Sequence, residues 1–230
     1  MRKQLVDKLY ATKMKGKKII VIGGSGDLGQ ALIPKLLSNG FDCISISRKS
    51  DRIESVNNIK CDITNFQKVN SVINQFKPNI IIHLAGNPFA PKSVEDPVYD
   101  MNLNIGGTLN LLEVCKNRKI DLLLFSSTAY VYGEPLYQPV DENHQRFHMG
   151  INSPYGISKS ACESYCNYYR EKCGVPVTIM RFFNIYGPNQ SLGLAVPDII
   201  DKIMKSEDGK VKLLGTDADS RDFLYVDDLA

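Results

Sequence analysis

The 230-residue sequence contains no apolar run that approaches the ~20 residues a helix needs to span a bilayer. Its first ten residues, ending at Tyr10, also lack the apolar core of a signal peptide. The net charge is only +3, with acidic and basic residues interspersed, so the chain offers no strong field for nucleic acid or an anionic membrane. We therefore expect a cytoplasmic protein whose partners are neither nucleic acids nor membranes.

Residues that bind metals or form disulfides are few and scattered. The three histidines are dispersed, and the six cysteines stand singly within predicted strands and helices. Cys162 and Cys166 have the i,i+4 spacing that can serve a metal on a helix, but no second ligand pair lies near them. We predict no metal site and expect the cysteines to be buried thiols in a reducing compartment.

A glycine-rich segment follows the first β-branched run of the chain. Residues 18–22 predict a buried strand, and a helical pattern begins at Gln30 and ends at Leu37. Between them lie Gly23, Gly26 and Gly29. In such a unit the first glycine permits a tight turn, the second lets backbone approach a pyrophosphate, and the third allows close helix packing. The helix N-terminus favours negative charge, so this segment predicts a dinucleotide-binding turn.

The next two predicted strands bear on the choice of dinucleotide. Ser47, after the strand at 42–46, stands where a carboxylate would bind the ribose of NAD, and Arg48 beside it suits the 2′-phosphate of NADP. A solvated basic turn is the alternative interpretation. A third strand, at 59–64, contains Asp62, which either meets the adenine or caps the helix that begins near Asn65. We expect NADP, with NAD as the alternative.

The rest of the chain continues to alternate strand and helix. Strands are predicted at 80–86, 122–125 and 177–181, and helices at 98–117 and from Pro154 onward. No linker or internal repeat interrupts this alternation, which predicts an α/β fold with a Rossmann-like, doubly wound parallel sheet. Ligands of such sheets bind outside the carboxyl ends of the strands. His83, within a strand, is interpreted as a core histidine.

Tyr155 and Lys159 are four residues apart in a helical pattern, so both side chains would share one helix face. The reference pKa of tyrosine is about 10. An ammonium group beside the phenol favours the phenolate and would lower that pKa toward neutrality. Thr128 follows the fifth strand and would face Tyr155 across a substrate, although a Ser/Thr-rich strand end can also satisfy its own backbone. This arrangement predicts proton transfer to and from a substrate hydroxyl that exchanges a hydride.

Together these segments resemble the extended short-chain dehydrogenase/reductase family, the NAD(P)-dependent nucleotide-sugar epimerases and dehydratases. The resemblance runs from about Lys18 to Ala230 and rests on eight ordered motifs. They are the glycine turn, Asp62, His83–Gly86, Asn104–Thr108, Ser126–Gly133, Tyr155 with Lys159, Arg181–Pro188 and Arg221–Asp228.

The resemblance implies a role for each matching residue. Tyr155 would be the general acid/base, Lys159 would lower its pKa and bind the nicotinamide ribose, and Thr128 would bind the reacting hydroxyl or carbonyl. The implied cofactor site comprises Gly23, Ser25, Gly26, Asp27, Leu28, Gly29, Arg48, Asp62, Ile63, Leu84, Ala85, Gly86, Tyr155 and Lys159. The implied substrate site comprises Ser127, Thr128, Asn184 and Arg221, the last two on the diphosphate of the sugar nucleotide. A homodimer through helices 98–117 and 155–173 is also implied.

The family contains several reactions, and the residues after Thr128 bear on them. Dehydratases carry a carboxylate there, whereas this chain has Ala129 and Tyr130, which disfavours dehydration and favours chemistry at C4 of a nucleoside-diphosphate sugar. The Ser-Ser-Thr-Ala segment favours a 4-epimerase, and Arg48 favours a 4-ketoreductase.

The family pattern also suggests how the chain is divided. We expect a leader at 1–17, a NAD(P)-binding domain at 18–182 and a partial substrate-binding lobe at 183–230, truncated relative to the family. A cofactor-binding protein without turnover is therefore a further alternative.

Overall fold

The computed structural model describes residues 16–49, 53, 56–144, 151–188, 190–208, 210–213 and 220–230. All but the last two residues of the expected leader lie outside these ranges. The centre of the molecule is a six-stranded parallel sheet with the order β3-β2-β1-β4-β5-β6. Its strands are β1 (Lys18–Ile22), β2 (Asp42–Ser47), β3 (Asn57–Lys60), β4 (Ile80–His83), β5 (Leu122–Thr128) and β6 (Val177–Phe182).

The strand order confirms the predicted doubly wound sheet. The chain winds outward from β1 to β3 and then returns to add β4, β5 and β6 on the other side of β1. The direction of winding reverses between β1 and β4, and at such a point the connections diverge and leave a crevice at the carboxyl ends of the strands.

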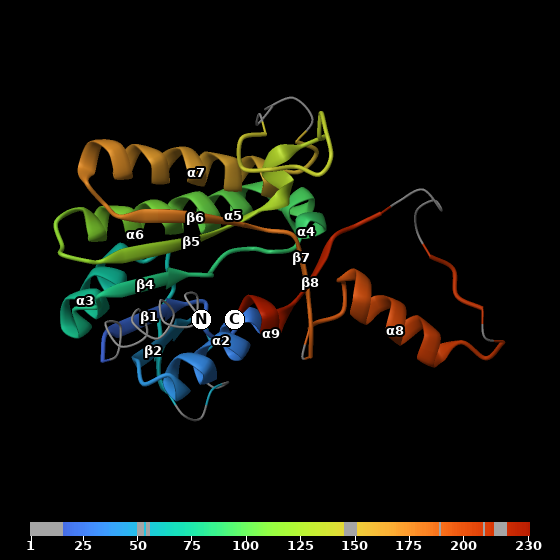
Figure 1. Cartoon of the computed structure of the whole chain (residues 1–230), viewed down its shortest axis with the longest axis horizontal. Helices are drawn as coiled ribbons and strands as arrows, with labels where there is room; N and C mark the ends of the chain where they lie inside the picture. The colour runs from blue at the N-terminus through green and yellow to red at the C-terminus, as the bar shows by residue number, and fades with distance from the viewer. Residues whose placement is uncertain are drawn as a thin grey trace, which may run out of the picture.

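Helices cover both faces of the sheet because alternate side chains of each strand point to opposite faces. Ile20 and Ile22 of β1 pack in one core cluster with residues of α3, α6 and α7, whereas Ile19 and Val21 pack in a second cluster with α2. Figure 1 shows α6 and α7 side by side over one face and α2 on the other. These helices are α2 (Asp27–Ser38), α3 (Phe66–Phe76), α6 (Gly107–Lys116) and α7 (Pro154–Cys173).

Helix α7 begins and ends where its sequence predicts. The Ser153 side chain accepts a hydrogen bond from the backbone N–H of Gly156 (3.2 Å), and Pro154 occupies the first turn, where its missing N–H costs nothing. Gly174 ends the helix with a φ of 71°, a left-handed conformation that favours glycine.

Two predicted boundaries and one predicted helix cap were wrong. Helix α2 already begins at Asp27 rather than at Gln30. Strand β3 ends at Lys60, its last residue paired with β2, so Asp62 lies in the turn beyond the strand. The cap of α3 is Asn65, whose side chain accepts from the backbone of Lys68 (2.9 Å), and not Asp62.

The helix expected at 98–117 is divided into three parts. The parts are the short helix α5 (Pro97–Met101), a π-helical turn, η1 (Asn102–Gly106), and α6, which follows that turn directly. Another short helix, α4 (Ala90–Glu95), precedes α5. Single π turns within α-helices occur frequently at functional sites.

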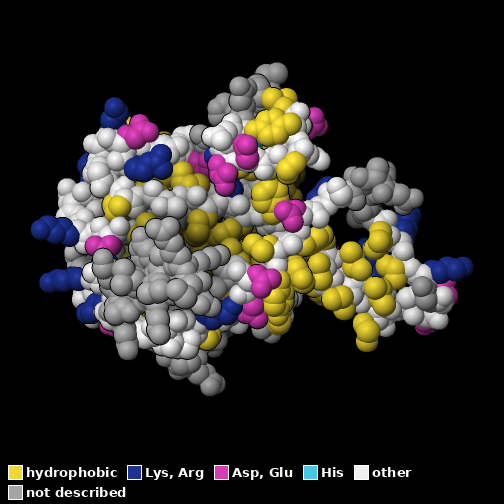
Figure 2. Space-filling model, in the orientation of Figure 1, with side chains coloured by type: hydrophobic (Ala, Val, Ile, Leu, Met, Phe, Trp, Pro, Cys, Tyr) yellow, Lys and Arg dark blue, Asp and Glu magenta, His cyan; other side chains and the backbone are white. Residues whose placement is uncertain are grey.

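After β6 the chain forms a small second unit. Strands β7 (Asn184–Tyr186) and β8 (Phe223–Tyr225) pair in parallel, accompanied by α8 (Ala195–Lys205) and α9 (Val226–Leu229). Ile200, Ile203 and Met204 of α8 are each more than half exposed, and hydrophobic side chains are prominent over this helix in Figure 2. Within the described residues, no helix is long and apolar enough to cross a membrane.

The close approach of α2 to the turn after β1 generates a stability prediction. A Cβ atom on Gly29 would lie 2.6 Å from the Cα of Gly24, whereas one on Gly106 would meet nothing within 4 Å. We expect Gly29→Ala to lower the free energy of unfolding by about 1–3 kcal/mol through overpacking. Gly106→Ala, the matched control, should leave it unchanged or raise it by about 0.5–1 kcal/mol. Urea denaturation checks both values, and equal effects of the two substitutions would contradict the prediction.

Candidate functional site

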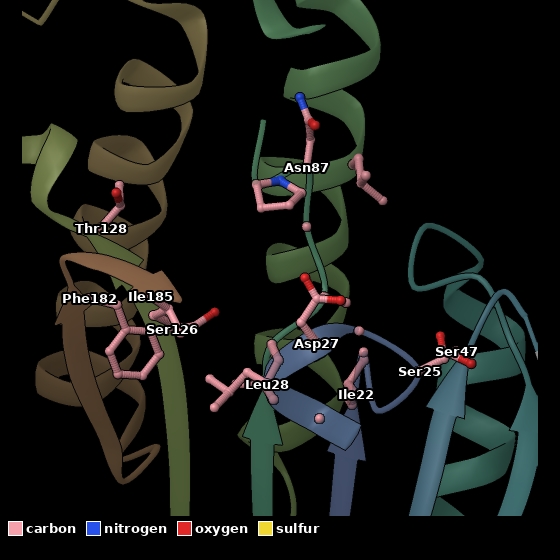
Figure 3. A pocket seen from close by; sticks show the side chains of 18 of the residues that line it. Ile22, Ser25, Asp27, Leu28, Ser47, Asn87, Ser126, Thr128, Phe182 and Ile185 are labelled. Carbon is pink, nitrogen blue, oxygen red and sulfur yellow. The ribbon is translucent and has the colours of Figure 1, made fainter. Parts of the chain in front are cut away.

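A cavity of about 560 Å³ lies at the carboxyl ends of the strands, across the point where the winding reverses. Figure 3 shows Ser25 and Ser47 toward one end, Ser126, Thr128 and Phe182 toward the other, and Asp27 with Leu28 between them. The cavity thus extends from the end of β2, past the glycine turn, to the ends of β5 and β6.

The structure brings nearly all the residues singled out in the sequence to this one cavity. Its lining includes Gly23, Ser25, Gly26, Asp27, Leu28, Gly29, Arg48, Asp62, Ile63, Leu84, Ala85, Gly86, Ser127, Thr128, Tyr155, Lys159 and Asn184. Arg221 is not among the lining residues; it is exposed and donates a hydrogen bond to the carbonyl of Ser220 (2.7 Å). The exposed Asn184 side chain donates to the carbonyl of Asp222 (3.0 Å).

The middle of the cavity is shaped by backbone. Gly23 has a φ of 90°, and a Cβ atom there would lie 2.6 Å from the backbone nitrogen of Ala85. Gly26, the N-cap of α2, has no side chain that could cap the N–H groups of the first turn. These groups and the helix dipole suit a phosphate. At Asp27, which follows, it is the backbone rather than the carboxylate that suits an anion.

At the β2 end of the cavity, polar side chains already have protein partners. The Ser47 hydroxyl donates to the carbonyl of Lys49, and the Arg48 guanidinium donates to the Tyr99 hydroxyl (2.6 Å). Oδ1 of Asp62 accepts from both the backbone N–H and the hydroxyl of Thr64 (2.9 and 2.8 Å). A hydroxyl and a guanidinium therefore stand where an NAD-binding carboxylate would be expected.

At the opposite end, Tyr155 is buried beside Thr128. Burial raises the pKa of Tyr155 to about 12, and a hydrogen bond with the Thr128 side chain offsets part of that rise. Burial therefore dominates, and the pKa of Tyr155 does not fall toward neutrality as the sequence led us to expect. The Lys159 Nζ instead donates to the carbonyl of Ser126 (2.8 Å) and lies 4.9 Å from the centre of the Phe125 ring.

Sequence reasoning missed a buried carboxylate behind this end of the cavity. Asp100 is fully buried and accepts hydrogen bonds from the amides of Asn87 (2.9 Å) and Asn104 (3.0 Å) and from the Ser158 hydroxyl (2.7 Å). Ser158 precedes Lys159, and Asn87 lines the cavity, so Asp100 fixes parts of the site that are distant in sequence. The i,i+4 spacing of Asp100 and Asn104 was the available signal.

A second missed residue is Glu163, which follows Lys159 by one helical turn and is fully buried. His83 is buried as predicted; its Nε2 lies 3.1 Å from the Thr108 hydroxyl, but its Nδ1 has no hydrogen-bond partner among the described residues. Burial lowers the pKa of His83 to about 3, so its ring is neutral. Within the described ranges, no group of three or more His, Cys, Asp or Glu residues could hold a metal.

Comparison with known proteins identifies the family. The family model described as "NAD dependent epimerase/dehydratase family" matches residues 19–230, and the chain belongs to this family. A protein of Methanocaldococcus jannaschii is 35% identical over 221 residues, which cover 92% of this chain and 70% of that protein. The UDP-glucose 4-epimerase of Rhizobium meliloti is 32% identical, with 94% and 71% covered.

Solved structures support the same assignment. The UDP-N-acetylglucosamine 4-epimerase of Methanobrevibacter ruminantium, in complex with UDP-N-acetylmuramic acid, has a TM-score of 0.81 and 28% identity, with 94% of this chain and 71% of that chain covered. The Thermus thermophilus UDP-glucose 4-epimerase, in complex with NAD, has a TM-score of 0.78 and 29% identity, with 92% and 71% covered. The resemblance inferred from the sequence motifs is thereby confirmed.

Proposed function

We propose that this protein is a nicotinamide-dependent 4-epimerase of a nucleoside-diphosphate sugar. One observation carries the proposal: Thr128, Tyr155 and Lys159 line the same cavity as the glycine turn, which suits a dinucleotide. A bound nicotinamide supplies the acceptor and donor of the hydride. Residues 18–182 would hold this cofactor, and residues 183–230 would face the sugar nucleotide.

The protein's own groups would orient the sugar and move its proton. Tyr155 takes the proton from the C4 hydroxyl during oxidation and returns it during reduction, while Thr128 binds the reacting oxygen. Burial raises the pKa of Tyr155 to about 12 and so favours the protonated phenol, which is the form that donates to a carbonyl oxygen in the reduction step. The oxidation step requires the phenolate form. Lys159 lies at the buried base of the cavity, where burial lowers the pKa of its ammonium group and where it would bind the nicotinamide ribose.

The β2 end of the cavity supports NADP over NAD. Ser47 and Arg48 occupy the end of this strand, and a guanidinium binds a phosphate through charge-assisted, bidentate hydrogen bonds. The Tyr99 hydroxyl already orients Arg48. The same observation favours a second candidate function, that of a 4-ketoreductase, which would carry out only the reduction.

Other reactions have less support. Tyr130 occupies the position where a dehydratase carries its carboxylate, and its ring packs edge-on against Tyr155 with 5.6 Å between ring centres. A tyrosine cannot replace a carboxylate that removes a carbon-bound proton. A cofactor-binding protein without turnover remains the alternative from another functional class. A cytoplasmic location is part of the proposal, because all six cysteines are free thiols, as a reducing compartment would keep them.

Removing the phenolic hydroxyl tests the catalytic assignment. We expect Tyr155→Phe to lower kcat about 10²- to 10⁴-fold, because the proton donor is lost while the ring remains. The measurement is interconversion of UDP-glucose, UDP-N-acetylglucosamine and UDP-glucuronate with their C4 epimers, for the wild type, Tyr155→Phe and the exposed control Tyr168→Phe.

A Tyr155→Phe variant as active as the wild type would contradict the role of Tyr155. If the wild type turns over none of these sugars, yet NADPH raises its melting temperature and UDP does not, the binding-only alternative gains support.

Replacing Arg48 tests the cofactor assignment. We expect Arg48→Ala to raise the Kd of NADPH about 10- to 100-fold and to leave that of NADH nearly unchanged, because only NADPH carries the 2′-phosphate. Fluorescence titration measures both values, with the exposed Arg170→Ala as the matched control. A wild type that binds NADH more tightly than NADPH would favour NAD and the 4-epimerase over the reductase.

We also propose a homodimer formed by α5, η1, α6 and α7. Exposed apolar side chains along α4, α5 and α7 support this arrangement; they include Val94, Val98, Met101, Ile157 and Tyr165. We expect Ile157→Asp to weaken dimerisation roughly 30-fold or more, because a charge would be buried in the interface. Sedimentation velocity at micromolar concentration checks this, with Ile203→Asp on α8 as the control. A monomeric wild type would contradict the dimer.

A further inference from the structure

Behind the catalytic end of the cavity lies an ion pair, between a buried glutamate and a partly exposed arginine, that does not line it. Glu163 of α7 is fully buried, and Arg181 of β6 contacts both of its carboxylate oxygens, with Nε to Oε1 and Nη2 to Oε2 both at 3.0 Å. This bidentate geometry offsets much of the cost of burying the Glu163 carboxylate.

The carboxylate of Glu163 also determines the orientation of a hydroxyl at the cavity wall. The Ser127 hydroxyl donates to Oε1 of Glu163 at 2.5 Å. An ionised carboxylate only accepts hydrogen bonds, and a serine hydroxyl has a single proton to give. That proton is therefore committed to Glu163. Toward the cavity, which it lines, Ser127 offers only the lone pairs of its oxygen.

Arg181 extends the same cluster to the turn that follows Thr128. Its Nη1 donates to the Tyr132 hydroxyl (3.0 Å), and its guanidinium carbon lies 4.8 Å from the centre of the Tyr132 ring. Tyr132 ends the 3₁₀ turn η2 (Ala129–Tyr132), which also places Tyr130 against Tyr155. The cluster of Ser127, Tyr132, Glu163 and Arg181 thus joins β5, η2, α7 and β6 directly behind the reacting groups.

We infer that Glu163 and Arg181 are positioning residues that hold Ser127 as an obligatory hydrogen-bond acceptor for a hydroxyl group of the sugar. The inference rests on the proposed function and makes it more specific. Tyr155 provides a hydroxyl proton for the reacting oxygen, whereas Ser127 nearby provides only an acceptor. Such a site distinguishes a sugar that carries a hydroxyl at the contacted carbon from a deoxy analogue, which would leave the acceptor unpaired.

Reversing the polarity of Ser127 tests the inference. In Glu163→Gln the side-chain amide can donate to Ser127, which frees the serine proton to point into the cavity. We expect kcat/KM for UDP-glucose to fall roughly 10- to 100-fold, while the Kd of NADPH stays within about threefold. The exposed Glu171→Gln on the same helix is the matched control and should behave as the wild type.

A double-mutant cycle separates positioning from a merely structural role. If Glu163 acts through Ser127, then Glu163→Gln should lower kcat/KM by no more than about threefold once Ser127→Ala is present. The alternative result is that the double variant loses kcat/KM by the product of the two single losses and that Glu163→Gln has a lower melting temperature. That result would mean that Glu163 only stabilises the fold, and it would overturn the inference. The proposed function would then stand, since the wild type turns over its substrate. A wild type without turnover of any of the three UDP-sugars would overturn both.

If Glu163→Gln does not fold, ligand binding by Ser127→Ala tests whether Ser127 accepts a hydrogen bond from a sugar hydroxyl. The wild type should bind UDP-glucose at least about tenfold more tightly than Ser127→Ala does, and one of the 3-, 4- and 6-deoxy analogues should bind both proteins equally. The nicotinamide amide is the other donor that Ser127 could meet. Weaker NADPH binding by Ser127→Ala, with sugar affinities unchanged, would overturn the assignment to a sugar hydroxyl.

Discussion

An ionisable group removed from water is costly unless the protein supplies partners for it, and the catalytic end of this molecule buries three ionisable groups. Asp100 has three hydrogen-bond donors, Lys159 has the carbonyl of Ser126, and Glu163 has Arg181 with Ser127. The partners come from the loop after β4, η1, β5, β6 and α7. These elements must dock together before any of the three groups is satisfied, which couples the integrity of the fold to the geometry of the site.

The other end of the cavity is built by the opposite means. Around the turn after β1 the decisive feature is the lack of side chains: Gly23 lies against the backbone of Ala85, and Gly29 lies against that of Gly24. Steric exclusion thus shapes the part of the cavity that suits phosphates, whereas a network of buried polar groups shapes the part that suits proton transfer. The two parts place different demands on sequence, because the first tolerates almost no added atom and the second requires matched partners.

This difference explains how much could be predicted from the sequence. The strands, the glycine turn and the cap of α7 are local signals, and all the site residues that the family motifs singled out, except Arg221, line the one cavity. The end of β3 depends on its pairing with β2, which a local pattern does not reveal. The pKa of Tyr155 depends on burial by distant elements, and Asp100 bonds to Ser158, 58 residues away. Arg221 lies in the small second unit, whose placement no local pattern determines.

The π turn at Asn102–Gly106 carries an extra consequence for the helix that contains it. Successive residues of an α-helix are rotated by about 100° around its axis. Deleting one residue from this turn could restore regular helical hydrogen bonds, yet it would rotate Asp100 by that angle relative to α6. The carboxylate would then leave the space between Asn87 and Ser158. The π turn therefore sets the rotation of α5 relative to α6 about their common axis. This rotation lets α6 face the core while Asp100 of α5 faces its polar partners.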